Sequence, residues 1–95
     1  MRNYEVAFIA QPDLDEAALN TLLDKAKGWI ATAGGQVTNV DLWGRRKLAY
    51  PIRKQTEGLY VFIQTQMTAA ATREIERSLR LTEQVIRFMI IRTDE

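Results

Sequence analysis

Four stretches of the chain have the residue pattern of β-strands. Residues 3–10 alternate between two sets of side chains, so one set is expected on each side of a sheet. Residues 36–52, 59–67 and 85–92 are three further runs rich in apolar residues. The pattern therefore predicts four strands in a chain of 95 residues.

Two stretches between these strands have the period of an amphipathic helix. In the first, apolar residues recur every three or four positions, and Asp13 and Asp15 are candidate N-caps. Gly34–Gly35 is expected to end that helix, because glycine readily adopts the backbone conformation of a C-terminal cap. In the second stretch, Thr68 is placed to cap a helix over residues 69–81.

This order of elements predicts a single α+β domain over residues 1–95 with the ferredoxin-like β-α-β-β-α-β fold. Two right-handed crossovers place both helices on one face of a four-stranded antiparallel sheet and leave the other face open for a partner. Gln64 and Gln66 share a parity with Tyr60 and Phe62, so we assign these four side chains to the open face. The alternative is that the two rings pack in the core beside a bulge.

The second strand has the marks of a sheet edge. Pro51 has no amide proton to donate to a neighbouring strand, and Gly44 indicates a bulge or a close backbone approach. Residues 53–58 are expected to form the hairpin loop that follows it. Three apolar side chains are expected to anchor the strand on the core: Leu48, Tyr50 and Ile52.

The composition excludes several kinds of chemistry. The chain has no histidine and no cysteine, so we expect no metal site, no cofactor and no thiolate chemistry. Ser78 is the only serine and has no histidine to activate it, so an enzyme is not expected. No run near 20 apolar residues predicts a membrane span, and no signal peptide is evident. The lack of cysteine suits a reducing cytoplasm.

Positive charge is concentrated in one segment of this nearly neutral chain. Residues 41–54 hold five cations and one carboxylate: Arg45, Arg46, Lys47, Arg53, Lys54 and Asp41. Cations on an edge strand discourage aggregation, but one or two lysines would serve that purpose. Arginine donates to phosphate oxygens in a planar fork, so the segment predicts contact with nucleic acid. By contrast, the arginines of residues 69–81 interleave with glutamates, as on a solvated, ion-paired helix face.

Strict alternation along the second strand predicts where these cations point. Arg45, Lys47 and Arg53 are expected on one side. Arg46 is expected on the side of the apolar anchors, where it passes beyond the helix layer or lies along its rim, since burial of an unpaired guanidinium is too costly. A bulge at Gly44 would rotate Arg45. All of these cations are expected to reach solvent.

The same segment carries a resemblance to a known family. The run from Gly44 to Arg53, G-R-R-K-L-A-Y-P-I-R, resembles the signature of the bacterial small-subunit ribosomal protein six family. The opening Arg2–Glu5 and the final strand from Val85 to Ile91 fit as well, so the resemblance covers essentially the whole chain. It implies a structural constituent of the small ribosomal subunit in the cytoplasm. It also implies binding to the central domain of small-subunit ribosomal RNA alongside ribosomal protein eighteen, a small basic partner.

The expected site residues form two groups. The RNA-binding residues are Arg2, Arg45, Arg46, Lys47, Arg53, Lys54 and Arg87. The partner-docking residues, on the apolar open face, are Ile9, Tyr60 and Phe62. The isolated chain is expected to fold alone as a monomer.

Two other functions are possible on the same fold. A stand-alone RNA-recognition domain would stack single-stranded bases on aromatic side chains of the sheet, but the first strand offers Ala7 and Ile9 there instead of an aromatic residue. A small phosphatase would need a glycine-rich loop to cradle an anion after the first strand. The loop at that point is Gln11-Pro12-Asp13, which is acidic and has no glycine.

Overall fold

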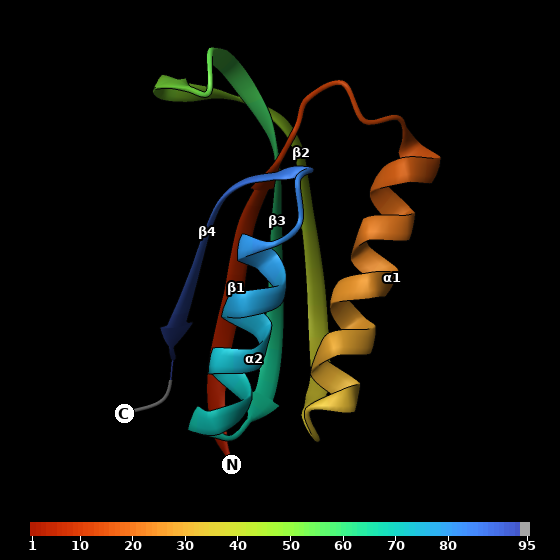
Figure 1. The fold of residues 1–95 in the computed structure, drawn as a ribbon, viewed down its shortest axis with the longest axis vertical. Coiled ribbons are helices and arrows are strands. Elements are labelled where there is room, and N and C mark those ends of the chain that lie inside the picture. Colours follow the sequence, from red (N-terminus) through yellow and green to blue (C-terminus); the bar gives the residue numbers. More distant parts are fainter. Residues whose placement is uncertain (94–95) are drawn as a thin grey trace.

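In a computed structural model that describes residues 1–93, the elements follow the predicted order. They are β1 (Arg2–Ala10), α1 (Glu16–Thr32), β2 (Gln36–Ile52), β3 (Gln55–Met67), α2 (Ala69–Arg80) and β4 (Val85–Arg92). The strands form one antiparallel sheet in the order β2-β3-β1-β4. Figure 1 shows how α1 and α2 are arranged along this sheet. The ferredoxin-like fold and the edge position of β2 are thereby confirmed.

Each helix starts at a side-chain cap. The Asp15 carboxylate accepts a hydrogen bond from the Ala18 amide at 2.8 Å, so Asp15 and not Asp13 is the cap of α1. The Thr68 hydroxyl accepts from the Ala71 amide at 3.1 Å and caps α2. The end of α1 is followed by Gly34 with a φ of +86°, a conformation that favours glycine.

The core lies between the helices and one face of the sheet. Side chains of alternating parity on β1 and β3 are buried against apolar residues of both helices. The largest fully buried side chains include Phe8, Ile30, Ile63, Ile75 and Leu79. Since every second residue of the central strands is buried, the predicted facing of β1 and β3 is confirmed.

The other face of the sheet is not covered by a helix. Tyr60, Phe62 and Gln64 are half-buried on β3, between fully buried neighbours. On β4, Met89 is 50% exposed and Ile91 is 44% exposed. The alternative in which Tyr60 and Phe62 pack in the helix-covered core is therefore wrong.

A bulge in β2 reverses the predicted directions of its cations. Gly44 has a φ of +77°, and the register with β3 shifts between Leu42 and Gly44. The extra residue moves the alternation by one position, so Arg45 lies opposite Leu59 and Arg46 opposite Gly58. The Arg45 side chain therefore leaves the strand on the helix-covered side, and the Arg46 side chain leaves it on the open side. Strict alternation predicted the reverse.

The predicted hairpin loop over residues 53–58 is wrong as well. The turn is only Arg53–Lys54, with φ values of +50° and +65°, and β3 begins directly after it at Gln55. Positive φ at both central residues is the geometry of a type I′ turn, whose twist suits paired strands. Arg53 thus belongs to a turn and not to one side of a strand.

Near this turn, β2 is longer than the strand that it pairs with. Between the pairs Lys47–Glu57 and Ile52–Gln55, four residues of β2 face one residue of β3. This irregular segment leaves Tyr50 57% exposed, and the half-buried Leu48 and Ile52 do not belong to the core cluster of residues 1–93, so the expectation that these three side chains anchor β2 on the core is wrong. Figure 1 shows the tip of the β2–β3 hairpin extending beyond the other strands and bending to the side of β4.

Candidate nucleic-acid and partner interface

All seven cations predicted to bind RNA are exposed, but they do not form one patch. Arg2 is paired with Met67, at the end of the sheet far from the β2–β3 turn. Lys47 lies opposite Glu57, whose carboxylate carries the opposite charge. Lys54 occupies the turn itself. The cations are therefore spread along the β2 edge and over both ends of the sheet.

Arg45 and Arg46 reach opposite sides of the sheet edge. The Arg45 guanidinium donates a hydrogen bond to the Pro12 carbonyl at 2.9 Å, in the loop between β1 and α1. The Arg46 guanidinium lies 5.5 Å from the centre of the Trp43 ring, within the range of a cation–π contact. The two side chains flank the strand, so a nucleic-acid backbone that wraps around this edge would meet both of them.

Arg53 and Arg87, which lie 34 positions apart in the chain, come together beside the C-terminus of α2. Arg53 donates to the Glu83 carbonyl at 3.3 Å, and Arg87 donates to the Tyr50 hydroxyl at 2.5 Å. The Arg87 guanidinium is also 6.0 Å from the Tyr50 ring centre. Both arginines line a hollow of about 240 Å³ together with Arg80, which the charge pattern of its helix did not single out.

An aromatic cluster occupies the open face beside β2. The Trp43 ring is stacked with Tyr60 at 6.5 Å between centres, and tilted against Phe62 at 4.6 Å. The indole N–H donates to the Asp41 carboxylate at 3.1 Å. Trp43 remains about half exposed, so the cluster is a surface feature. Trp43 lies on the same side of β2 as Asp41, which pairs with Phe62, so regular alternation places the indole on the open face.

The three predicted docking residues line one apolar groove. Ile9, Tyr60 and Phe62 border a hollow of about 200 Å³ on the open face, and Met89 and Ile91 of β4 are among its other apolar lining residues. Two charged residues, Glu5 and Arg87, also take part in the lining. The geometry therefore offers an apolar surface with charged borders, which is typical of a protein-binding site.

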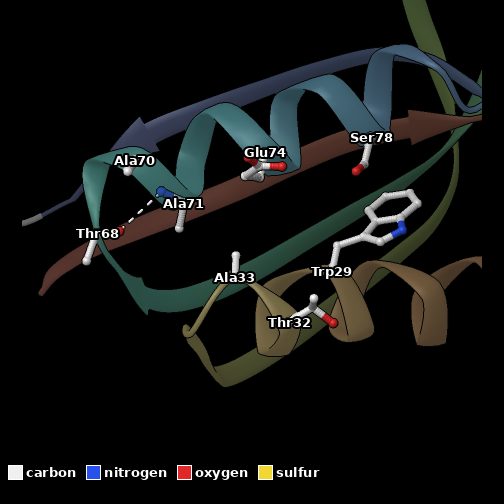
Figure 2. A pocket seen from close by; sticks show the side chains of 8 residues that line it. All are labelled: Trp29, Thr32, Ala33, Thr68, Ala70, Ala71, Glu74 and Ser78. Carbon is white, nitrogen blue, oxygen red and sulfur yellow. Dashed lines mark hydrogen bonds between the residues drawn. The ribbon is translucent and has the colours of Figure 1, made fainter.

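A larger hollow of about 470 Å³ lies between α1 and α2, on the far side of the sheet from this groove. Figure 2 shows Trp29 and Ala33 facing Ala71, Glu74 and Ser78 across it. Among the described residues that line it, Glu74 is the only charged one, and none is a cation. This hollow therefore has none of the charge that a phosphate needs, and it does not extend the candidate RNA surface.

The loop after β1 does not form an anion cradle. Its Gln11 amide donates to the Gln84 carbonyl at 2.9 Å, and the Pro12 carbonyl is occupied by Arg45. An anion needs free amide donors, and this loop presents a carbonyl and the Asp13 carboxylate instead. Within residues 1–93, no helix combines the length and the hydropathy needed to cross a membrane.

Comparison with known proteins identifies the family. The sequence model described as "Ribosomal protein S6" matches residues 3–92. This chain belongs to the ribosomal protein S6 family. The S6 family consists of structural proteins without enzymatic activity, so the phosphatase alternative is excluded.

Individual relatives agree over their full length. "Small ribosomal subunit protein bS6" of Caldanaerobacter subterraneus subsp. tengcongensis is 45% identical over all of both chains, and that of Clostridium novyi is 50% identical over all of both chains. Among solved structures, 30S ribosomal protein S6 from Thermotoga maritima superposes with a TM-score of 0.92 at 32% identity. The superposition covers 97% of this chain and 87% of the other.

Proposed function

We propose that this protein is a structural constituent of the small ribosomal subunit in the cytoplasm, where it binds the central domain of small-subunit ribosomal RNA together with ribosomal protein eighteen. Its membership of the S6 family, whose relatives are named as small-subunit proteins, supports the general role. The observation that supports the finer role is the open face of the sheet, where an apolar groove lies beside exposed cations.

The two partners are assigned to different surfaces. Ribosomal protein eighteen docks on the groove bordered by Ile9, Tyr60 and Phe62, because burial of exposed apolar side chains is the main favourable term in protein association. RNA phosphates meet the cations of the β2 edge and the hairpin turn. Since the open face and the β2 edge adjoin each other, one RNA site can contact both proteins.

RNA binding by the isolated chain is expected to be weak. The chain has 13 cations and 12 carboxylates, so its overall field attracts a polyanion only weakly. A basic partner adds phosphate contacts to the same RNA site and should raise the affinity. Titration of a central-domain RNA fragment with and without ribosomal protein eighteen tests this. Equal affinity in both titrations would refute the shared site.

Sedimentation of extracts from the protein's own cells tests the general role. The protein should comigrate with small subunits at low salt and dissociate at high salt, because contacts to phosphate weaken as salt rises. Migration with free protein at both salt concentrations would contradict the proposal.

A stand-alone domain that binds single-stranded RNA is the second candidate. The exposed cluster of Trp43, Tyr60 and Phe62 favours it, since aromatic rings on a sheet can stack on bases. Ala7 on β1 counts against it, because this central position offers no ring. Tight binding of short single-stranded RNA without ribosomal protein eighteen, lost in Trp43→Ala, would favour this candidate over the first.

A further inference from the structure

Three arginines from three separate elements line one hollow beside the C-terminus of α2. Arg53 comes from the β2–β3 turn, Arg80 is the last residue of α2, and Arg87 is near the start of β4. The hollow measures about 240 Å³, several times the roughly 30 Å³ that one water molecule occupies. We propose that this arginine cleft binds a backbone phosphate of RNA, and this inference rests on the proposed function.

Each guanidinium makes one hydrogen bond within the protein and has other donors available. Arg53 uses one nitrogen on the Glu83 carbonyl, and Arg87 uses one on the Tyr50 hydroxyl. Arg80 uses one on the Glu76 carboxylate, at 2.6 Å. A guanidinium has five N–H donors in a rigid fork, so each side chain is positioned and can still bind an anion. A ligand would therefore meet a site that is already partly ordered.

The charges in the cleft are not balanced within the protein. Among residues 1–93, Arg80 is the only one of the three arginines with a carboxylate within 4 Å. Two like charges on the border of one hollow repel each other. A bound anion removes this repulsion, and a phosphate oxygen accepts from arginine in the geometry that the fork prefers.

The ligand is a phosphate within a polymer and not a free phosphate ion. The Arg80 side chain is 62% exposed, so solvent screens its charge. The cleft also lies at the C-terminal end of α2, where the carbonyl dipoles disfavour an anion. A free ion would therefore bind weakly. A phosphate that belongs to RNA is held near the cleft by the other contacts of the chain, which raises its local concentration.

The cleft differs from the cations of β2 in its geometry. Arg45 and Arg46 point to opposite sides of their strand, so they can contact two separate phosphates. Arg53, Arg80 and Arg87 line one hollow, so a single phosphate seated in it can contact more than one of them. Arg80 is therefore predicted to matter for RNA affinity, although its helix face has the mixed charges of an ordinary solvated surface.

The test replaces Arg80 and a matched arginine of the same helix. Arg80→Gln should lower the affinity of the full chain, with ribosomal protein eighteen present, for a central-domain RNA fragment by about tenfold, since hydrogen bonds to charged groups contribute this much. The slope of log affinity against log salt should fall by about one unit. Arg73→Gln is the control, because Arg73 is exposed on α2 and does not line the cleft. It should leave both quantities unchanged.

The outcomes separate the cleft from the function on which it rests. If the wild-type chain binds the RNA with a salt-dependent affinity and Arg80→Gln binds equally well, the cleft is refuted and the proposed function stands. If the wild-type chain shows no such binding, both are refuted. Arg80→Lys keeps the charge but loses the fork, so it should recover the salt slope and only part of the affinity. Equal loss in Arg73→Gln and Arg80→Gln would also refute the cleft, because it would mean that only net charge matters.

Discussion

The two faces of the sheet are both apolar, yet only one of them is covered. On β3, Val61 and Ile63 face the helices and are completely buried, whereas Tyr60 and Phe62 face the other way and remain partly exposed. Apolar surface left in water forgoes about 25 cal/mol of stabilisation per Å². Burial in this fold is therefore decided by where the helices lie, and the uncovered face is suited to a partner.

Four variants test this contrast between the faces. Three of them act on stability to a degree that depends on the face, and the last acts on the edge that joins the two faces.

Ile63→Ala should have the largest effect, because it removes three carbon atoms from the centre of the covered face. Ile63 is completely buried, and truncation of such a side chain costs about 2–5 kcal/mol of unfolding free energy. Chemical denaturation measures the loss. A cost below about 1 kcal/mol would mean that the covered face is loosely packed, and the contrast with the open face would fail.

Gly58→Ala should have the next largest effect on stability. The open face is tightly packed at Gly58, although no helix covers it. A Cβ on Gly58 would lie 2.2 Å from Cγ2 of Ile9, so either the side chain or the strand must shift. Overpacking of this kind costs about 1–3 kcal/mol. Gly28→Ala is the control, because a Cβ at Gly28 meets nothing within 4 Å and alanine favours the helix. Thermal unfolding should show the first variant destabilised and the second slightly stabilised.

Phe62→Ala should lower the affinity for the partner protein more than it lowers the stability of the fold. Phe62 is half-buried on the open face, so its truncation is expected to cost less than about 2 kcal/mol of stability. Affinity for ribosomal protein eighteen should fall by about tenfold or more, as for other aromatic side chains at the centre of an interface. Denaturation and a binding titration measure the two effects. A stability loss of about 3–5 kcal/mol with unchanged partner affinity would assign Phe62 to the core instead.

Simultaneous replacement of Arg45, Arg46 and Lys47 with alanine should have the smallest effect on stability. All three side chains are exposed, and surface substitutions usually change stability by no more than about 0.5 kcal/mol each. RNA affinity should fall for every sequence, and the salt slope should shrink by about one unit per lost phosphate contact. An unchanged slope, with the fold intact by circular dichroism, would mean that these cations only protect the sheet edge.

The order of elements and the two faces of the central strands could be predicted from the sequence. The alternation on β1 and β3 and the helical periods on α1 and α2 are set by residues close together in the chain, so local patterns suffice. The cap at Thr68 and the glycine that follows α1 are likewise local. The exposure of all the predicted cations followed from the cost of burying charge without a partner.

The directions of those cations were decided by the tertiary structure. One extra residue at Gly44 exchanges the sides of Arg45 and Arg46. The alternation of side chains along a strand does not by itself predict such a shift in register. Trp43 precedes this shift and keeps the side of Asp41, so it lies on the open face in contact with Tyr60 and Phe62.

The arginine cleft depends still more on the fold. Arg53, Arg80 and Arg87 belong to a turn, a helix end and an edge strand, and they line one hollow only because α2 and the hairpin tip both lie beside the start of β4. Local sequence therefore determined which cations the chain carries and which of them are exposed to solvent. Because side chains far apart in the chain converge only after the elements pack, the fold alone decided which charges act together.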